Sequence, residues 1–243
     1  DMDRFFVAKG SWGHSEALLS VEESHHCLRV MRKTAGDRIE VFDGGGRWAR
    51  GVIAEGNDRE VTVRIEEEGT TQGKKPSLLM AIAVAKGKTM ELVIQKAVEL
   101  GVDRIQPLLT ENMAIHWSGE ILKGKQEKWR RVAMEACKQC GQNIVPEVCP
   151  VVDFGDVLEA SGEGARFLAS LDQRARPLRC EMEELPAELC SIELFIGPEG
   201  DFSPSETERA ITSGLRPVSF GSRVLRVETA VIYGLSVLGY ELH

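Results

Sequence analysis

Two glycine-containing loops in the second half of the chain carry the residues best suited to holding a small molecule. The first loop follows an apolar stretch, Ile192–Ile196, and runs from Gly197 to Ser203. The second loop follows Pro217–Phe220 and begins at Gly221. Glycine lets backbone N–H and C=O groups come close to a ligand, and such groups suit an adenine edge or a ribose better than side chains do. The two loops are therefore predicted to face one ligand.

Each of these loops lies between a predicted strand and a predicted helix. The first ends in a helix start, with Ser203 as the cap, Pro204 in the first helical position and Glu206 closing a capping box. The second ends where Glu228–Ala230 opens an apolar helix. In α/β proteins, a strand, a loop and a helix in this order place a ligand at the carboxyl end of the sheet.

The rest of the second half has the pattern of an α/β domain. From Ser77 onward, apolar strands alternate with helices, as in a mostly parallel sheet covered on both faces. The predicted helices include one capped by Thr89 and ended by Gly101, and a long one over Gly119–Gln142. The predicted strands are Leu78–Val84, Ile105–Leu109, Phe167–Leu171, Ile192–Ile196 and Val218–Phe220.

The first half is predicted to be a small, mostly β domain. A capping box at Ser20 opens a short helix, and the sequence from Glu66 to Pro76 is charged, rich in glycine and threonine, and without apolar periodicity, which indicates a linker. The predicted domains are therefore residues 1–72 and 73–243. The expected strands of the first domain are Arg4–Val7, Arg38–Phe42, Arg47–Ile53 and Glu60–Ile65.

The two loops together resemble those of a known family. Phe195–Glu206 (FIGPEGDFSPSE) and Phe220–Ala230 (FGSRVLRVETA) resemble the paired loops of the SPOUT methyltransferases, and specifically of the RsmE family. His25–Gly44, Gly87–Met113 and Ala133–Val148 are similar to that family as well, so the resemblance covers nearly the whole chain. It implies an α/β knot, which is a trefoil-knotted and mostly parallel sheet, preceded by a small PUA-like β-barrel that binds RNA, in an obligate homodimer.

The resemblance also implies an activity and a set of site residues. The family methylates N3 of a uridine in small-subunit (16S) ribosomal RNA with S-adenosylmethionine (SAM), and the assembled 30S subunit is the expected substrate. The implied cofactor-binding residues are Leu171, Ile196, Gly197, Pro198, Glu199, Gly200, Phe220, Gly221, Val224, Leu225, Arg226, Thr229 and Ala230. The candidate RNA contacts are Arg4, Arg29, Arg32 and Lys33, together with Lys86 and Lys88 beyond the first strand of the second half.

Methylation at N3 requires loss of a proton, because a uridine keeps that proton at neutral pH and is then a poor nucleophile. The enzyme must orient the base, assist the loss of the proton and stabilise the negative charge that results. Arg226 is the candidate for stabilising the charge, and Glu199 or Glu228 is the candidate proton acceptor. Helix starts favour carboxylates for structural reasons alone, so Glu228 is equally well explained as a helix-start residue.

Three positions depart from the family pattern. The family usually has Glu-Gln-x-x-Arg where this chain has Lys138 and, four residues later, Gln142. No role for charge is therefore carried over to these two positions. The glycine pair that follows the Gly-Pro-Glu motif in the family is Gly200-Asp201 in this chain.

Composition limits the partners. The formal net charge of −8 argues against a general binder of DNA or RNA, although the stretch from Arg29 to Arg50 is locally basic. That stretch fits either a modest groove for a folded RNA or an ordinary solvated strand face. No apolar run approaches the roughly 20 residues of a membrane span, and the chain does not start with a basic and then apolar segment. We expect a cytoplasmic protein without membrane or DNA partners.

Metal binding is not predicted. The six cysteines include one C-x-x-C, Cys137 to Cys140, but lack the second close pair that a zinc site needs. The five histidines include no H-x-x-x-H pattern. Cys137 and Cys140 lie on a predicted helix with other inward-facing residues, so they are interpreted as core or interface residues.

Other enzyme classes lack their motifs in this chain. There is no G-x-G-x-x-G after an early strand, no P-loop and no G-x-S-x-G elbow. Two alternatives remain: a non-catalytic RNA-binding or ribosome-assembly protein on the same fold, and a SPOUT methyltransferase with another RNA target, such as a tRNA ribose. The intact glycines of both loops favour an active pocket over the first alternative. The N-terminal β domain favours RsmE over the second.

Overall fold

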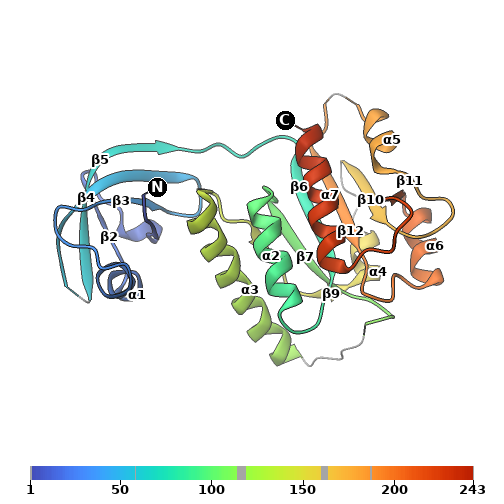
Figure 1. Cartoon of the computed structure of the whole chain (residues 1–243), viewed down its shortest axis with the longest axis horizontal. Coiled ribbons are helices and arrows are strands. Elements are labelled where there is room, and N and C mark those ends of the chain that lie inside the picture. Colours follow the sequence, from blue (N-terminus) through green and yellow to red (C-terminus); the bar gives the residue numbers. More distant parts are fainter. Residues whose placement is uncertain (1, 58, 114–118, 160–163, 187, 243) are drawn as a thin grey trace. The chain divides into compact units, whose positions relative to one another are not determined.

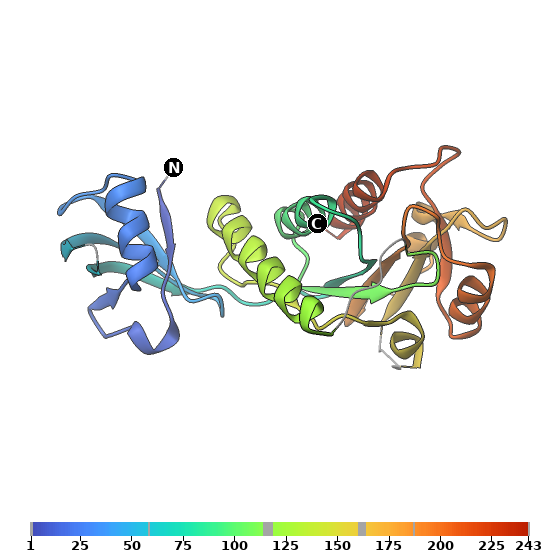
Figure 2. The ribbon, with the colours of Figure 1, turned by 90° about the horizontal axis from the view of Figure 1, so that it is seen from below.

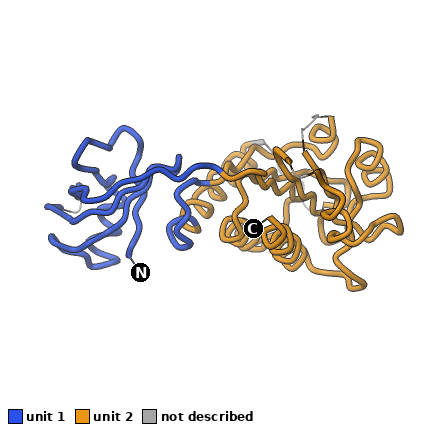
Figure 3. Tube along the Cα trace, turned by 90° about the horizontal axis from the view of Figure 1, so that it is seen from above, with its two compact units in different colours: residues 1–73, 137–145 blue, residues 74–136, 146–243 orange. Residues whose placement is uncertain are grey.

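The computed structural model describes residues 2–57, 59–113, 119–159, 164–186 and 188–242. The chain divides into two compact units (Figure 3). The first unit consists of residues 1–73 and 137–145, and the second of residues 74–136 and 146–243. Residues 137–145 are therefore grouped with the N-terminal unit, although they lie far from it in the sequence.

The first unit is built on a sheet of the strand order β1-β3-β4-β5-β2 (Figure 1). Most neighbouring strands are antiparallel, and β1 pairs with β3 in parallel. Side chains from the strands and from the helical segment after β2 meet in one core that includes Phe5, Ile39, Val61 and Cys27. The elements are β1 (Arg4–Phe6), η1 (Lys9–Ser11), β2 (Glu16–Leu18), α1 (Val21–His25), η2 (His26–Val30), β3 (Arg38–Phe42), β4 (Arg47–Asn57) and β5 (Glu60–Thr70).

The predicted linker is wrong in its first part. Strand β5 does not end at Ile65 but continues to Thr70, and it pairs there with the beginning of β4. A shift of register between Arg50 and Gly51 lets the pairing continue. Acidic residues of the extension form ion pairs with the facing arginines, as in the 2.8 Å pair between Glu68 and Arg47. Cross-strand pairs of opposite charge stabilise a strand that has no apolar alternation.

The helical turn after β2 contains two unusual backbone features. Ser20 caps α1 and accepts a hydrogen bond from the Glu23 N–H at 3.2 Å, as the sequence predicts. The chain then continues as one turn of π-helix, η2, and Arg32 adopts the left-handed conformation with φ of 57°. A π-helical turn and a left-handed arginine are both uncommon, and such features often occur at functional sites.

The second unit is an α/β domain. Its sheet has the strand order β11-β13-β10-β12-β6-β7-β8, with β9 paired to β7, and its strand pairs are parallel. The elements are β6 (Ser77–Ala83), α2 (Thr89–Glu99), β7 (Arg104–Leu109), α3 (Gly119–Cys140), β8 (Glu147–Val148), β9 (Val152–Asp153), α4 (Phe154–Glu159), β10 (Ala165–Ala169), β11 (Arg176–Pro177), α5 (Leu178–Glu183), β12 (Ser191–Ile196), α6 (Pro204–Thr212), β13 (Arg216–Ser219) and α7 (Val227–Glu241). The helix predicted to be capped by Thr89 has Lys88 in the cap position.

Helices cover both faces of this sheet, as two adjacent residues of β12 illustrate (Figure 2). Leu194 lies against α7, because a Cβ added at Gly234 of that helix would be 2.7 Å from its side chain. Phe195 lies on the opposite face, where its ring contacts Phe154 of α4 edge-on at 6.2 Å. Successive strand residues point to opposite faces, so a strand buried on both faces is apolar throughout. None of the helices in the described part of the chain is long and apolar enough to cross a membrane.

Candidate functional site

A cavity lies at the carboxyl ends of three neighbouring strands, β13, β10 and β12. Because the strands are parallel, their carboxyl ends meet at one edge of the sheet. The empty space of the cavity, including the part that is open to solvent, is about 590 Å³. Its lining residues are Ala169, Ser170, Leu171, Ile196, Gly197, Pro198, Glu199, Asp201, Val218, Phe220, Gly221, Arg223, Val224, Leu225, Val227 and Ala230.

The first wall of the cavity is the loop after β12. Phe202 anchors this loop in the core, where its ring stacks on Phe154 at 4.7 Å. The loop packs closely at Gly197, where an added Cβ would lie 3.1 Å from the Phe202 ring. The loop ends in the predicted capping box, with Ser203 and Glu206 each accepting a hydrogen bond from the other's backbone N–H at 3.1 and 2.8 Å. The loop is thus fixed at both ends by its own sequence.

The second wall is the loop between β13 and α7. Gly221 adopts a φ of 109°, which only glycine adopts readily, and its N–H donates to Ser219 Oγ at 3.2 Å. The preceding residue, Phe220, rests on Tyr233 of α7 with 5.3 Å between ring centres. The exposed Val224 extends the wall toward solvent, with 77% of its surface accessible. The left-handed glycine therefore turns the chain so that the loop faces the first wall.

Ten of the thirteen residues predicted to bind the cofactor line this cavity. Gly200, Arg226 and Thr229 do not line it, and Thr229 lies instead in a neighbouring groove. The structure thus brings together most of the predicted set, while their role in binding stays a prediction. Six lining residues were not predicted from the sequence. Arg223 had a signal in its position inside the second loop; the others are Ala169, Ser170, Asp201, Val218 and Val227.

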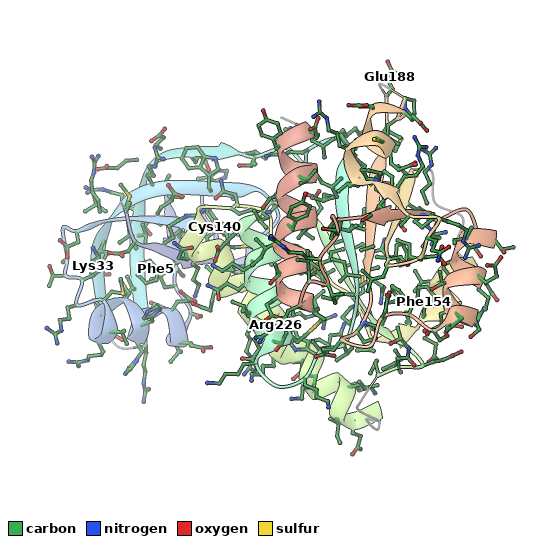
Figure 4. The ribbon with its side chains drawn as sticks, turned by 45° about the vertical axis from the view of Figure 1, so that its right-hand side comes forward. Phe5, Lys33, Cys140, Phe154, Glu188 and Arg226 are labelled. Carbon is green, nitrogen blue, oxygen red and sulfur yellow. The ribbon has the colours of Figure 1, made fainter. Side chains whose placement is uncertain are left out.

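The three catalytic candidates occupy different places. Glu199 lies in the cavity wall and is exposed. Arg226, which is labelled in Figure 4, is the exposed N-cap residue of α7. Glu228 is in the first turn of the same helix, where a carboxylate is favoured by the unpaired backbone N–H groups. The arginine that lines the cavity is Arg223, to which no role was assigned from the sequence.

Arg4 is bonded within the first unit, which argues against its predicted role as an RNA contact. Only 7% of its side chain is exposed, and its guanidinium donates to Glu40 Oε1 at 2.8 Å, to the Cys137 carbonyl oxygen at 2.8 Å and to the Asn143 side chain. It also lies 4.6 Å above the ring of Phe42. Arg4 therefore fastens residues 137–143 to the sheet of the first unit.

The other basic candidates are accessible to different degrees. Arg29 and Arg32 are exposed at and after η2. Lys33 is half-buried and pairs with Asp3 at 2.6 Å, and this hydrogen bond raises the lysine pKa above its ordinary value. In the second unit, Lys86 and Lys88 are exposed on either side of Gly87, between β6 and α2. These five positions remain predicted RNA contacts.

The departure from the family pattern at Lys138 has a structural explanation. Its ammonium group pairs with Glu23 of α1, and both side chains are nearly buried, with 9% and 11% of their surfaces exposed. A lysine at this position therefore neutralises a carboxylate inside the first unit. Gln142 contributes its backbone oxygen to the Arg4 guanidinium at 3.4 Å. Both positions belong to the segment that Arg4 holds.

Comparison with known proteins places these features in one family. The model of an RNA methyltransferase domain matches residues 73–239, and that of an RNA methyltransferase PUA domain matches residues 19–66. The ribosomal RNA small subunit methyltransferase E of Synechocystis sp. is 33% identical over 96% of this chain and 76% of its own length.

Two solved structures agree with the chain over nearly its whole length. A Legionella pneumophila protein described as a methyltransferase, in complex with bound SAM, has a TM-score of 0.89 at 31% identity, covering 99% of this chain and 98% of its own. A ribosomal RNA small subunit methyltransferase E of Neisseria gonorrhoeae bound to SAM has a TM-score of 0.87 at 26% identity, covering 98% and 97%.

The fold and the cavity at its strand ends define an RNA methyltransferase of the SPOUT class, preceded by a PUA-type module. The predicted fold class is thereby confirmed. More narrowly, the chain belongs to the ribosomal RNA small subunit methyltransferase E (RsmE) family.

Proposed function

We propose that this protein is a SAM-dependent methyltransferase that modifies N3 of a specific uridine in small-subunit (16S) ribosomal RNA. The cavity between the two glycine loops is the observation that carries the proposal. Support comes from membership of the RsmE family and from the SAM bound by similar structures. The assembled 30S subunit is the proposed substrate, and the cytoplasm is the proposed compartment.

The cavity has the volume and the mixture of apolar and charged residues expected of a site for SAM. Small-molecule sites typically enclose about 300–1,000 Å³ and combine apolar walls with a few placed polar groups. Ile196, Phe220 and Leu225 supply apolar surface for an adenine ring. The carboxylate of Glu199 adds a negative charge to a wall that also holds Arg223, and this charge suits the sulfonium and ammonium groups of SAM. When bound, SAM supplies a methyl group already activated by its sulfonium.

The protein's own residues would then prepare the uridine. The base must lose its N3 proton, and the resulting anion needs a nearby cation. Arg226, the N-cap of α7, is proposed for this role, and Arg223 is an arginine that lines the cavity itself. Glu199 is the proposed proton acceptor, because among the three catalytic candidates it alone lines the cavity. Glu228 is the alternative proton acceptor, although its position in the first turn of α7 explains it equally well.

RNA contacts are proposed for the exposed cations of both units. Arg32 is the strongest case in the first unit, because its side chain is exposed and its left-handed backbone is uncommon for an arginine. Arg29 and Lys33 extend the same basic stretch, and Lys86 and Lys88 supply charge in the second unit. Phosphate contacts of this kind position an RNA and make its binding depend on salt concentration.

A homodimer is proposed from an exposed apolar surface beside the cavity. A groove between α5, the end of β13 and α7 is lined by Ile232, Tyr233 and Tyr240, which are 38%, 46% and 83% exposed. Phe220 and Gly221 line both this groove and the cavity. A large apolar patch on a protein surface usually marks an interface. Sedimentation at micromolar concentration is expected to give a dimer, and a monomer would contradict this part of the proposal.

The test is methyl transfer to ribosomal particles. Purified protein is incubated with labelled SAM and with 30S subunits that lack the modification, and the RNA is digested to nucleosides for mass spectrometry. The expected product is 3-methyluridine at a single position of 16S RNA. A different methylated nucleoside or RNA would indicate a SPOUT methyltransferase with another target. Binding of subunits without transfer would indicate a non-catalytic assembly protein.

A further inference from the structure

The loop that forms the first wall of the cavity is held by a residue from a different part of the sheet. Asn112 follows β7, and its Nδ2 donates to the backbone oxygen of Asp201 at 3.0 Å and, less closely, to that of Gly200 at 3.4 Å. Asn112 and Asp201 are 89 residues apart in the sequence. Strand β6 lies between β7 and β12 in the sheet, so the β7 loop spans one strand to reach the cavity wall.

Asp201 is itself the centre of the contacts in this wall. Its N–H donates to the Pro198 oxygen at 3.0 Å, and its Oδ1 accepts from the Phe202 N–H at 2.8 Å. Its Oδ2 accepts from the N–H of Leu171 at 3.4 Å, which ties the loop after β12 to the loop after β10. Both Leu171 and Asp201 line the cavity. The aspartate therefore joins two walls of one site.

The backbone of Asp201 shows that this position is not an ordinary turn. Its φ of 59° lies in the left-handed region, where glycine is favoured and most side chains are strained. Aspartate and asparagine tolerate this region better than other residues, because their short side chains bond to nearby backbone groups. A carboxylate kept at a position that suits glycine, and bonded there to two backbone N–H groups, indicates a role for the side chain.

A second set of hydrogen bonds joins the loop after β7 to the first turn of α6. The Glu111 N–H donates to Glu206 Oε1 at 2.9 Å, and Ser205 Oγ lies 3.2 Å from both carboxylate oxygens of Glu111. Glu206 is 3% exposed and also closes the capping box of α6. The start of α6 is therefore fixed independently of Asn112. Loss of Asn112 is expected to release the cavity side of the loop while the helix start stays in place.

We infer that Asn112 and Asp201 are positioning residues, a clamp that holds the Gly197–Phe202 loop in the conformation that binds the cofactor. The inference rests on the proposed function, because it names the residues that preorganise the SAM pocket. A loop already held in its binding conformation loses less freedom when the ligand binds, so affinity rises without a new ligand contact. Asn112 is absent from the cavity lining and would act only through the loop.

Four variants separate this role from a merely structural one. Asn112→Ala removes both donors, and Asn112→Asp keeps the shape but turns a carboxylate toward two carbonyl oxygens. Asp201→Gly relaxes the backbone and removes the carboxylate, whereas Asp201→Asn keeps the left-handed preference and one acceptor oxygen. Thr212→Ala, at the exposed far end of α6, is the matched control.

SAM titration by calorimetry and thermal unfolding are measured for each variant. One hydrogen bond is worth a factor of about five in an equilibrium constant, so Asn112→Ala is expected to weaken SAM binding about five- to tenfold. Asn112→Asp is expected to weaken it further, and Asp201→Asn to retain more affinity than Asp201→Gly. Hydrogen exchange of the Phe202 and Leu171 amides, measured without SAM, is expected to accelerate in Asn112→Ala and to stay unchanged in Thr212→Ala.

The possible results distinguish the clamp from the proposed function. If the wild-type protein binds SAM and the Asn112 and Asp201 variants bind it equally well, the clamp is wrong and the proposed function stands. The clamp is also wrong if Asp201→Gly binds SAM more tightly than the wild type, because the position would then be only a strained turn. If the wild-type protein binds no SAM, either alone or with 30S subunits, the proposed function fails and the clamp fails with it.

Discussion

The packing of α7 against the cavity wall predicts that alanine substitutions at two glycines of this helix, Gly234 and Gly239, have opposite effects on Tm. A Cβ at Gly234 would lie 2.7 Å from Leu194 Cδ2 and 2.8 Å from Phe220 Cζ. Carbon atoms in contact are normally about 3.5–4.0 Å apart, so one neighbour must move by roughly 1 Å. Leu194 is fully buried, whereas Phe220 is only half-buried and lines the cavity. Gly234→Ala is therefore expected to displace Phe220 into the site.

The magnitude follows from two opposing effects. Overpacking a core typically destabilises a protein by about 1–3 kcal/mol, while alanine is favoured over glycine in a helix interior by about 1 kcal/mol. Gly234→Ala should therefore lower the unfolding free energy by about 1 kcal/mol, which corresponds to about 2–4 °C in Tm for a chain of this length. Gly239 of the same helix has no atom within 4 Å of its added Cβ. Gly239→Ala should raise Tm by up to about 3 °C.

The assay combines thermal unfolding with SAM titration of both variants. Gly234→Ala is expected to weaken SAM binding at least fivefold, because Phe220 forms part of the wall, and Gly239→Ala is expected to bind SAM as the wild type does. If both variants raised Tm equally, or if Gly234→Ala bound SAM with unchanged affinity, the packing of α7 on Phe220 would not control the site.

Three further predictions concern other parts of the molecule. Arg4→Met should destabilise the first unit by about 2 kcal/mol in urea unfolding, because it removes the donors to Glu40 Oε1 and to the Cys137 carbonyl oxygen, while Arg50 still pairs with Glu40. Normal stability with weaker binding of ribosomal RNA would favour Arg4 as an RNA contact. Burial raises the pKa of the Cys137 thiol to about 12, so little thiolate is present at pH 8. Iodoacetamide at pH 8 should therefore label the exposed Cys140 and spare the buried Cys137, which mass spectrometry of the labelled native protein would show. Arg226→Ala should bind SAM normally and methylate 30S subunits at least tenfold more slowly, and an unchanged rate would remove Arg226 from the mechanism.

The parts of the site that depend on local sequence were predictable. The capping box of Ser203 and Glu206 and the start of the second loop at Gly221 each follow from a few neighbouring residues, and the structure contains both. The parallel sheet was also predictable, because strands buried on both faces form continuous apolar runs. Together these features were enough to locate the cavity edge and ten of its lining residues.

The features that the sequence did not reveal depend on contacts between distant segments. Arg4 looked like an exposed basic residue, but Cys137 and Asn143, which bury it, lie more than a hundred residues away. Strand β5 continues through charged residues because arginines of β4 face them, and periodicity alone cannot show such pairing. Asn112 lies in the family-like stretch Gly87–Met113 but was assigned no role from the sequence, and its contact with Asp201 depends on the sheet order.

Calorimetric titration of the protein with SAM, beside Gly197→Val, tests most directly whether the two glycine loops form a methyl-donor site. A Cβ at Gly197 would lie 3.1 Å from the Phe202 ring, and the larger valine should push the loop off its anchor. The wild type is predicted to bind one SAM per chain, and Gly197→Val to bind it at least tenfold more weakly. Absence of binding by the wild type, both alone and with 30S subunits, would contradict the proposed methyltransferase.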